Sequence, residues 1–557
     1  MIRSRTFYLR QPQEPALQEP IMDNQRLLLF IGLSMTALLL WQAWEKEQLP
    51  PPPAPMATTS TVPVTPEIAT TPAATATATL ASAQRISVTT DMFVAEIDSL
   101  GGDLRYLALR KHPDKADQPD TPFVLMTDSG SKFYIAQSGL LGRGAPWPNH
   151  TTPYTIEKSR YELVSDHDTL KVPLVWMGPG NVRVVKTYTF QRGSYAVKVD
   201  YAIHNGGKSE VDAYLYAQLL HSHVEEKSML STVPSYTGGA IYTPEKKYEK
   251  ITFADMAKKP LDRPVIGGWV AMLQHYFVGA WMPPATSHNT FYAKPQDGGR
   301  YAIGYKTTEA VKIAPGQQVD LQTTLYAGPK EHQRLLRQAE GMELTVDYGY
   351  LTVIAAPLFW LLQYIHTWVG NWGWAIIILT MLIKLVFYPL SAASYKSMAH
   401  MRRMQPKMEA IKERYRDDKQ KMQQATMELY KTEKINPLGG CLPILVQIPV
   451  FIALYWVLLE SVEMRQAPFA LWIKDLSSAD PYFVLPVLMG ASMLVTQMLS
   501  PQMGDPLQRK VMMALPVVFT VFFAFFPAGL VLYWVVQNLL SILQQWSITR
   551  RIETGAK

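Results

Sequence analysis

One lysine lies inside an apolar stretch, where a charge is expensive. Lys384 comes twelve residues after Trp372, and no other charge occurs between Trp372 and Tyr388. A lysine near the centre of a bilayer costs about 2.5–3.5 kcal/mol on insertion scales. Two interpretations are open: the long side chain extends to the water at the cytoplasmic surface, or the ammonium group faces a water-filled cavity between helices.

Uncharged polar residues in the same and other apolar stretches favour the cavity. The candidate groove residues are Lys384, Thr380, Gln447, Gln537, Asn538 and Ser541. No Asp or Glu lies deep in these stretches, whereas ion-coupled transporters usually place carboxylates or paired charges there. A lone cation among amides and hydroxyls suits a wet groove that holds a passing polar or acidic segment. A transporter that uses the same cavity is the alternative, and a hydrolase with Lys384 as base and Ser541 as nucleophile is a third interpretation.

Motifs for other chemistry are weak. The Gly-x-Ser-x-Gly nucleophile pattern and a phosphate-binding loop are absent. His221 and His223 would lie on one face of a strand, but no nearby residue completes a metal-ligand set. We therefore expect no enzymatic activity, no cofactor and no metal site.

The composition separates a water-soluble part from apolar segments. The 557 residues carry a formal net charge of +7. Most of the apolar segments lie near the N-terminus and beyond residue 350. Residues 1–26 form a polar N-terminus, and 27–44 are an uncharged run of bilayer length, which we interpret as an uncleaved signal anchor. Residues 45–84 are rich in Pro, Ala and Thr, which predicts a disordered linker.

Alternation with a period of two predicts that residues 85–340 are an all-β sandwich. Val182–Phe190 and Tyr195–Ile203 read as a hairpin around the Gln191–Ser194 turn, with apolar residues on one face of the second strand and charged residues on the other. The single cysteine excludes an internal disulfide, so this domain must be stabilised by its own hydrophobic core.

The C-terminal part alternates apolar spans with loops. Aromatic and polar residues are mixed in 341–370, which predicts an amphipathic helix lying in the membrane interface. The anchor and five further segments make six spans. The predicted segments are span 371–391, cytoplasmic hairpin 392–436, span 437–460, periplasmic loop 461–481, span 482–499, cytoplasmic loop 500–510, spans 511–527 and 528–546, and cytoplasmic tail 547–557.

The basic residues orient these spans. Segment 392–436 holds eleven Lys and Arg against six acidic residues, whereas loop 461–481 holds only Arg465 and Lys474. Lys and Arg accumulate in short cytoplasmic loops. We therefore expect both termini in the cytoplasm and the β domain on the opposite, periplasmic side.

The basic segment also has an apolar seam. Its seam residues follow a 3-4-3-4 spacing: Met401, Met404, Met408, Ile411 and Tyr415. With a turn at Asp417 and Asp418, this spacing predicts an antiparallel helical hairpin. The methionines of this segment either form the core of the hairpin or provide an adaptable contact surface. Its basic residues either only set the orientation of the spans in the membrane or also contact ribosomal RNA or anionic lipid. The candidate partner contacts are Arg402, Arg403 and Lys407.

Three blocks of sequence resemble the YidC/Oxa1/Alb3 family of membrane insertases, and most closely the Gram-negative type. Residues 431–443 read KTEKINPLGGCLP, 447–449 read QIP, and 461–476 read SVEMRQAPFALWIKDL. The resemblance extends from Met22 to the C-terminus. The chain differs from many relatives at Lys384, where they carry arginine. The positive charge is kept, but the two parallel hydrogen bonds that a guanidinium can form are lost.

The resemblance implies a five-helix core around a hydrophilic groove open to cytoplasm and lipid, in the bacterial inner membrane. Client segments would slide along the third and last spans while the groove draws their polar tails across. The residues implied for the slide are Phe451, Tyr455, Tyr533 and Trp534. The implied partners are nascent membrane proteins, the Sec translocon, membrane lipids and, weakly, the ribosome, with no specific nucleic acid. The β domain resembles the supersandwich of sugar enzymes, but no residue indicates a sugar site.

Overall fold

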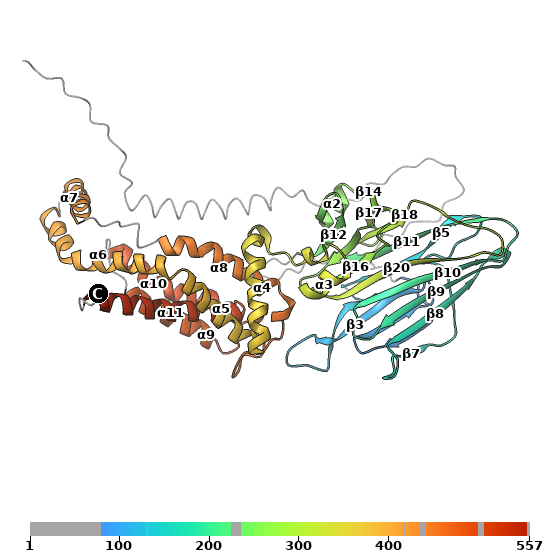
Figure 1. Cartoon of the computed structure of the whole chain (residues 1–557), viewed down its shortest axis with the longest axis horizontal. Coiled ribbons are helices and arrows are strands. Elements are labelled where there is room, and N and C mark those ends of the chain that lie inside the picture. The colour runs from blue at the N-terminus through green and yellow to red at the C-terminus, as the bar shows by residue number, and fades with distance from the viewer. Residues whose placement is uncertain are drawn as a thin grey trace, which may run out of the picture. The chain divides into compact units, whose positions relative to one another are not determined.

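The chain combines a β sandwich with a set of apolar helices (Figure 1). A computed structural model describes residues 80–130, 132–223, 236–416, 418–433, 442–499 and 506–553. Residues 77–557 cluster as one compact unit. The predicted anchor 27–44 lies outside the described residues, as does nearly all of the linker 45–84.

The sandwich contains two sheets, in agreement with the predicted fold class. The first has eleven strands, in the order β14-β17-β18-β11-β5-β3-β2-β1-β7, with β19 paired to β11 and β4 to β3. Its strands are β1 (Arg85–Thr89), β2 (Phe93–Asp98), β3 (Asp103–Pro113), β4 (Pro122–Met126), β5 (Tyr134–Arg143), β7 (Arg160–Glu162), β11 (Val211–Ser222), β14 (Leu261–Ile266), β17 (His288–Gln296), β18 (Arg300–Thr307) and β19 (Val311–Ile313).

The second sheet has nine strands, in the order β13-β12-β15-β16-β20-β10-β9-β8-β6. Its strands are β6 (Thr155–Ile156), β8 (Thr169–Met177), β9 (Val182–Gln191), β10 (Ala196–Asn205), β12 (Gly238–Thr243), β13 (Lys247–Ile251), β15 (Trp269–Leu273), β16 (Phe277–Met282) and β20 (Gln318–Pro329). The predicted hairpin is confirmed as β9–β10, with Val197 opposite Phe190. Val199 and Tyr201 are fully buried while Lys198 is exposed, as the alternation predicted.

Helices dominate the chain after the sandwich. They are α2 (Phe253–Lys258, still within the sandwich), α3 (His332–Gln338), α4 (Thr352–Val369), α5 (Trp372–Val386), α6 (Tyr388–Arg414), α7 (Lys419–Thr432), α8 (Leu442–Glu460), α9 (Val484–Leu499), α10 (Pro506–Phe523) and α11 (Ala528–Glu553). Short 3-10 helices occupy Pro179–Asn181, Met342–Thr345, Gly349–Leu351 and Val462–Met464.

The boundary between α5 and α6 differs from the predicted span 371–391. The Asn371 side chain caps α5 by accepting a hydrogen bond from the Trp374 amide. α5 ends at Val386, and α6 continues after a bend of 67°. Pro389 in the first turn of α6 explains the break, because proline has no N–H to donate to the carbonyl four residues earlier, in α5.

The expected set of six spans is not confirmed by helix length. Among the described helices, α4 alone is long and apolar enough to cross a membrane, and the bent α5–α6 pair adds a second if it counts as one span. α8, α9 and α10 contribute shorter apolar stretches. α4 is the helix that the sequence placed in the interface. Its Trp360, Tyr364 and Trp368 recur every four residues and are exposed. Tyr364 stacks on Trp360 and meets Trp368 edge to face, so one face of α4 is a strip of aromatic rings.

Two helices, α6 and α7, occupy the segment predicted as a hairpin. Asp418 caps α7 by accepting a hydrogen bond from the Lys421 amide at 3.0 Å. The Tyr430 hydroxyl donates to the Met408 sulfur at 3.7 Å, which joins the two helices. Met401 is buried in the seam, whereas Met427 is 56% exposed. Of these two methionines, only Met427 is available as a contact surface.

Candidate functional site

Lys384 lies between helices rather than at a surface. The residue is 6% exposed, and its ammonium donates a hydrogen bond of 2.7 Å to the hydroxyl of Ser541 on α11. Ser541 in turn donates to the carbonyl of Gln537 at 2.8 Å. Thr380, one turn earlier on α5, is fully buried and donates to the Ile376 carbonyl of its own helix. The structure thus places the cation against α11, and it does not support extension to the cytoplasmic surface.

One face of α11 is polar along its length. Tyr533, Gln537, Ser541 and Gln544 follow one another at helical spacing, so they share a face. The side-chain carbonyl oxygens of Gln537 and Gln544 are buried and accept no hydrogen bond from the described residues. Gln447 on α8 lies near the Tyr533 hydroxyl, which is itself buried and has no hydrogen-bond partner among the described residues. Buried polar atoms normally have partners, so this face is suited to polar groups from outside the chain.

Asn538 does not join Lys384, contrary to the grouping in the sequence prediction. Its amide donates to the hydroxyl of Ser492 on α9 at 2.9 Å. Seven residues later, the Gln545 amide donates to the Leu499 carbonyl at 3.0 Å. These two bonds tie α11 to α9. Sequence reasoning missed Ser492 and Gln545, although the seven-residue spacing from Asn538 places Gln545 on the same helix face.

Three of the four predicted slide residues, Phe451, Tyr533 and Trp534, meet at the contact of α8 with α11. The fourth, Tyr455, lies one turn farther along α8, and we call the four residues together the aromatic seam. The Phe451 ring centroid lies 4.6 Å from that of Trp534 and 6.0 Å from that of Tyr533. Tyr455 packs against Phe526 at 6.3 Å. Tyr533 is only 1% exposed. A client segment would therefore reach Tyr533 only when α8 and α11 separate.

The predicted partner contacts on the hairpin have three different environments. Arg402 is exposed. The Arg403 guanidinium donates to the Ile552 carbonyl at 2.6 Å, so it caps the C-terminal end of α11. Lys407 forms an exposed ion pair of 2.6 Å with Glu433, and such surface pairs contribute little stability. Arg403 is therefore engaged within the chain, and its predicted role as a partner contact stays a prediction.

The Lys384–Ser541 pair lacks the surroundings of a hydrolase. A nucleophile and its base must lie within hydrogen-bond distance, and 2.7 Å meets that condition. Acyl transfer also needs donors aimed at the developing oxyanion. Ser541 lies in the middle of α11, where the backbone N–H groups are used by the helix itself. In this arrangement the Lys384 ammonium donates to the serine oxygen, and the serine hydroxyl donates to the Gln537 carbonyl rather than to Lys384.

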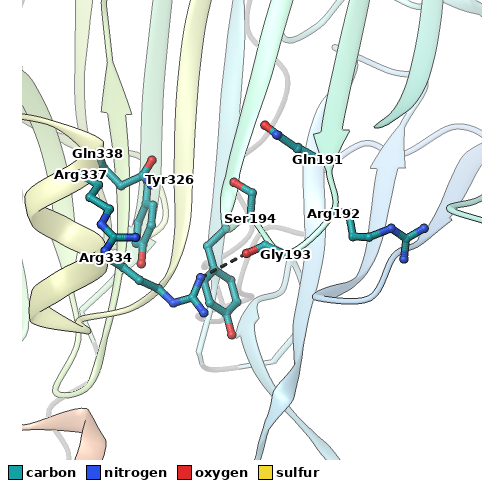
Figure 2. A pocket seen from close by; sticks show the side chains of 9 residues that line it. Gln191, Arg192, Gly193, Ser194, Tyr326, Arg334, Arg337 and Gln338 are labelled. Carbon is teal, nitrogen blue, oxygen red and sulfur yellow. Dashed lines mark hydrogen bonds between the residues drawn. The ribbon is translucent and has the colours of Figure 1, made fainter. Parts of the chain in front are cut away.

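The described part of the sandwich has polar pockets of its own. A pocket of about 240 Å³ lies between α3 and the β9–β10 turn, and Figure 2 shows its lining. Arg334 donates to the Gly193 carbonyl at 3.1 Å and covers the Tyr195 ring, while Arg192 points away from the pocket (Figure 2). Among the described residues, no cluster of His, Cys, Asp and Glu could hold a metal ion.

Comparison with known proteins connects this arrangement to a family. Residues 85–361 match the family described as YidC periplasmic domain, and residues 364–555 match the family described as 60Kd inner membrane protein. A protein named "Membrane protein insertase YidC" from Methylobacillus flagellatus is 51% identical, over 96% of this chain and 98% of its own. The chain belongs to the YidC family. The resemblance stated from the sequence is thereby confirmed, and with it an inner-membrane protein that carries a periplasmic β domain.

Other YidC proteins agree. A YidC insertase from Alkalilimnicola ehrlichii is 49% identical, over 96% of each chain. A solved structure, described as an active YidC insertase with the first transmembrane domain resolved, is 20% identical. It covers 83% of this chain and 92% of its own, with a TM-score of 0.40.

Proposed function

We propose that this chain is an insertase and chaperone for integral membrane proteins, as its relatives are named. The observation that carries the proposal is the buried Lys384 ammonium, held by the neutral hydroxyl of Ser541. The side-chain carbonyls of Gln537 and Gln544 on the same helix face find no partner among the described residues. This arrangement suits an exchangeable polar guest. A carboxylate or amide of a client can replace the serine hydroxyl without breaking an internal ion pair.

The groove lowers the cost of moving a polar tail into the membrane. A client's polar groups would otherwise lose water with no replacement, which costs several kcal/mol for each group. Lys384 and the polar face of α11 supply hydrogen-bond partners for them. The client's apolar segment would follow the aromatic seam into the lipid. This division of labour needs no chemical step.

The membrane arrangement proposed is six spans: residues 27–44 together with α5, α8, α9, α10 and α11. In this arrangement α4 lies in the outer interface, where its strip of aromatic rings suits the headgroup region. The basic hairpin and both termini face the cytoplasm. Clients arrive from the ribosome or the Sec translocon, and anionic lipids meet the basic hairpin.

Three variants test the groove: Lys384→Ala, Lys384→Arg and Ser541→Ala. Lys474→Ala is a matched control, because Lys474 is an exposed lysine of loop 461–481. The client is a single-span protein with an acidic translocated tail, and protease protection of that tail measures insertion. A hydrogen bond to a charged group contributes about 1.5–3 kcal/mol, so Lys384→Ala should slow insertion by about tenfold or more. Lys384→Arg and the control should remain near wild type. Ser541→Ala keeps the charge but removes its internal partner, so it should slow insertion less than Lys384→Ala does.

Two results would contradict the proposal. Equal insertion by Lys384→Ala and wild type, at equal protein level, would remove the groove charge from the mechanism. A larger loss of insertion in Ser541→Ala than in Lys384→Ala, with full activity in Lys384→Arg, would instead indicate that the serine itself reacts.

A further inference from the structure

The outer end of α8 carries a buried ion pair to the β domain. Glu460 is the last residue of α8, and its carboxylate lies 3.6 Å from the ammonium of Lys330. The two side chains are 5% and 4% exposed. Lys330 directly follows β20, and its amide donates to the Tyr276 carbonyl at 2.8 Å. The cation is thus fixed to the sandwich by its own backbone.

A histidine from the same region caps the helix. His275 lies between β15 and β16, and its Nε2 is 3.1 Å from the Leu459 carbonyl and 3.8 Å from the Glu460 carboxylate. Burial lowers the pKa of His275 to about 4, so the ring is neutral near pH 7 and donates its Nε2 proton to that carbonyl. The last carbonyls of a helix lack partners within the helix. His275 supplies one from the β domain.

The loop that follows α8 is also attached to the sandwich. Arg465 donates to the Pro113 carbonyl at 2.7 Å and to the Asp114 carbonyl at 2.9 Å. Its guanidinium lies 5.4 Å from the ring centroids of both Phe123 and Phe277. Arginine is suited to such a site because its planar fork binds carbonyls while its face covers aromatic rings. The β domain therefore contacts α8 and its outer loop through different strands.

This attachment lies close to the aromatic seam. Tyr455 and Phe451 precede Glu460 by five and nine residues, so they lie roughly 8 and 14 Å along α8 at about 1.5 Å per residue. The same outer loop holds the start of α11, because the Ala528 and Gly529 amides donate to the Ser478 and Leu476 carbonyls at 2.7 and 2.9 Å. We infer that Lys330 is a positioning residue: through Glu460 it fixes α8 relative to this loop and α11, and thereby sets how closely the seam is held. That role serves insertion only if the proposed function holds, but the position of α8 can be measured without any client.

A disulfide across the seam reports that position. Phe451→Cys and Trp534→Cys are introduced into the full chain, after Cys441→Ser removes the native thiol. The side chains at these two positions lie across the seam, with ring centroids 4.6 Å apart. The rate of disulfide formation is then compared with Lys330 intact, with Lys330→Met, and with the exchanged pair Lys330→Glu and Glu460→Lys. Lys247→Met is the matched control, because Lys247 forms an exposed pair with Glu340 on the same domain.

Lys330→Met should slow disulfide formation by at least about fivefold, because an unpaired buried carboxylate is strongly unfavourable and moves toward water. The exchanged pair should restore the rate to within about twofold, since it keeps one charge of each sign. The control should leave the rate unchanged. If Lys330→Met does not accumulate, Glu460→Gln gives the same test, because it removes the charge and nearly keeps the shape.

The inference is overturned if the seam forms its disulfide at the wild-type rate in Lys330→Met or Glu460→Gln, with the sandwich intact by limited proteolysis. It is also overturned if the exchanged pair is as slow as Lys330→Met, since the contact would then act through shape alone. Neither result depends on Lys384. A failure of the groove experiment therefore leaves this test valid, and a failure here leaves the groove proposal intact.

Discussion

Removing most of the β domain should harm insertion less than removing one lysine from it. Deletion of residues 90–320 takes away most strands of both sheets but keeps Lys330 and α4. Glu460 and Lys330 then both meet water, and α8 keeps its packing against α4. Lys330→Met instead leaves the sandwich in place, so the Glu460 carboxylate stays buried, at 5% exposure, after it loses its charged partner. The two changes differ in what surrounds the remaining charge.

The magnitudes follow from burial. Breaking a buried ion pair by removing one partner costs about 3–5 kcal/mol, whereas an exposed pair contributes only about 0.2–1 kcal/mol. The polar contacts of Arg465 are likewise replaced by water in the deletion, so their loss is largely offset. At this junction the point variant should therefore be destabilised by about 2–4 kcal/mol more than the deletion.

The assay is protease protection of a client in membranes that contain equal amounts of each protein. The deletion should retain most insertion, and Lys330→Met should retain clearly less. Lys330→Arg, which keeps the charge, is the control and should resemble wild type. An inactive deletion at normal protein level, beside a fully active Lys330→Met, would refute the reasoning and give the sandwich a direct part in insertion.

Three further predictions concern other regions. Burial lowers the pKa of Lys186 to about 7, and its ammonium donates to two buried carbonyls. Lys186→Met should therefore destabilise the sandwich by about 3 kcal/mol. Thermal unfolding measures this change, and an unchanged Tm would contradict the prediction. Burial raises the pKa of Glu463 to about 7 from 4.5, so its charged form is disfavoured in the folded state and stability should fall as pH rises from about 4.5 to 7. Glu463→Gln should abolish that fall and be more stable above pH 7 by up to about 3 kcal/mol, which unfolding at pH 5 and 8 would detect. The double variant Arg402→Glu and Lys407→Glu should weaken co-sedimentation with ribosomes and flatten its salt dependence. If this variant binds like wild type at every salt concentration, the hairpin is excluded as a ribosome contact. Arg403→Glu should instead loosen the end of α11.

Local periodicity predicted the parts of the fold that depend on one buried face. The β9–β10 hairpin follows from alternation, because only one side of each strand meets the core. The pairing of β11 with β5 and β18 joins segments far apart in the sequence. No local pattern encodes it, since the register arises when the sheet assembles.

The candidate site shows the same division. A charge in an apolar stretch identified Lys384, but Ser541 is 157 residues away, and only tertiary packing makes it the partner. Asn538 was grouped with Lys384 because both are polar in apolar segments, yet the amide turns to α9. Lys330 gave no signal at all: a lysine after a strand looks like an ordinary surface charge until the end of α8 covers it.

The neutral partner of Lys384 has a consequence for the proteins that pass through the groove. Within the described chain, no carboxylate pairs with this ammonium, so its positive potential is not cancelled locally. At about 4 Å and an effective dielectric constant near 20, it attracts an acidic group and repels a basic one by about 4 kcal/mol each. The proposed groove should therefore admit acidic flanks more readily than basic ones. A single side chain would thus select client segments by charge, and this selection during insertion would contribute to the unequal distribution of charges across the membrane in the finished proteins.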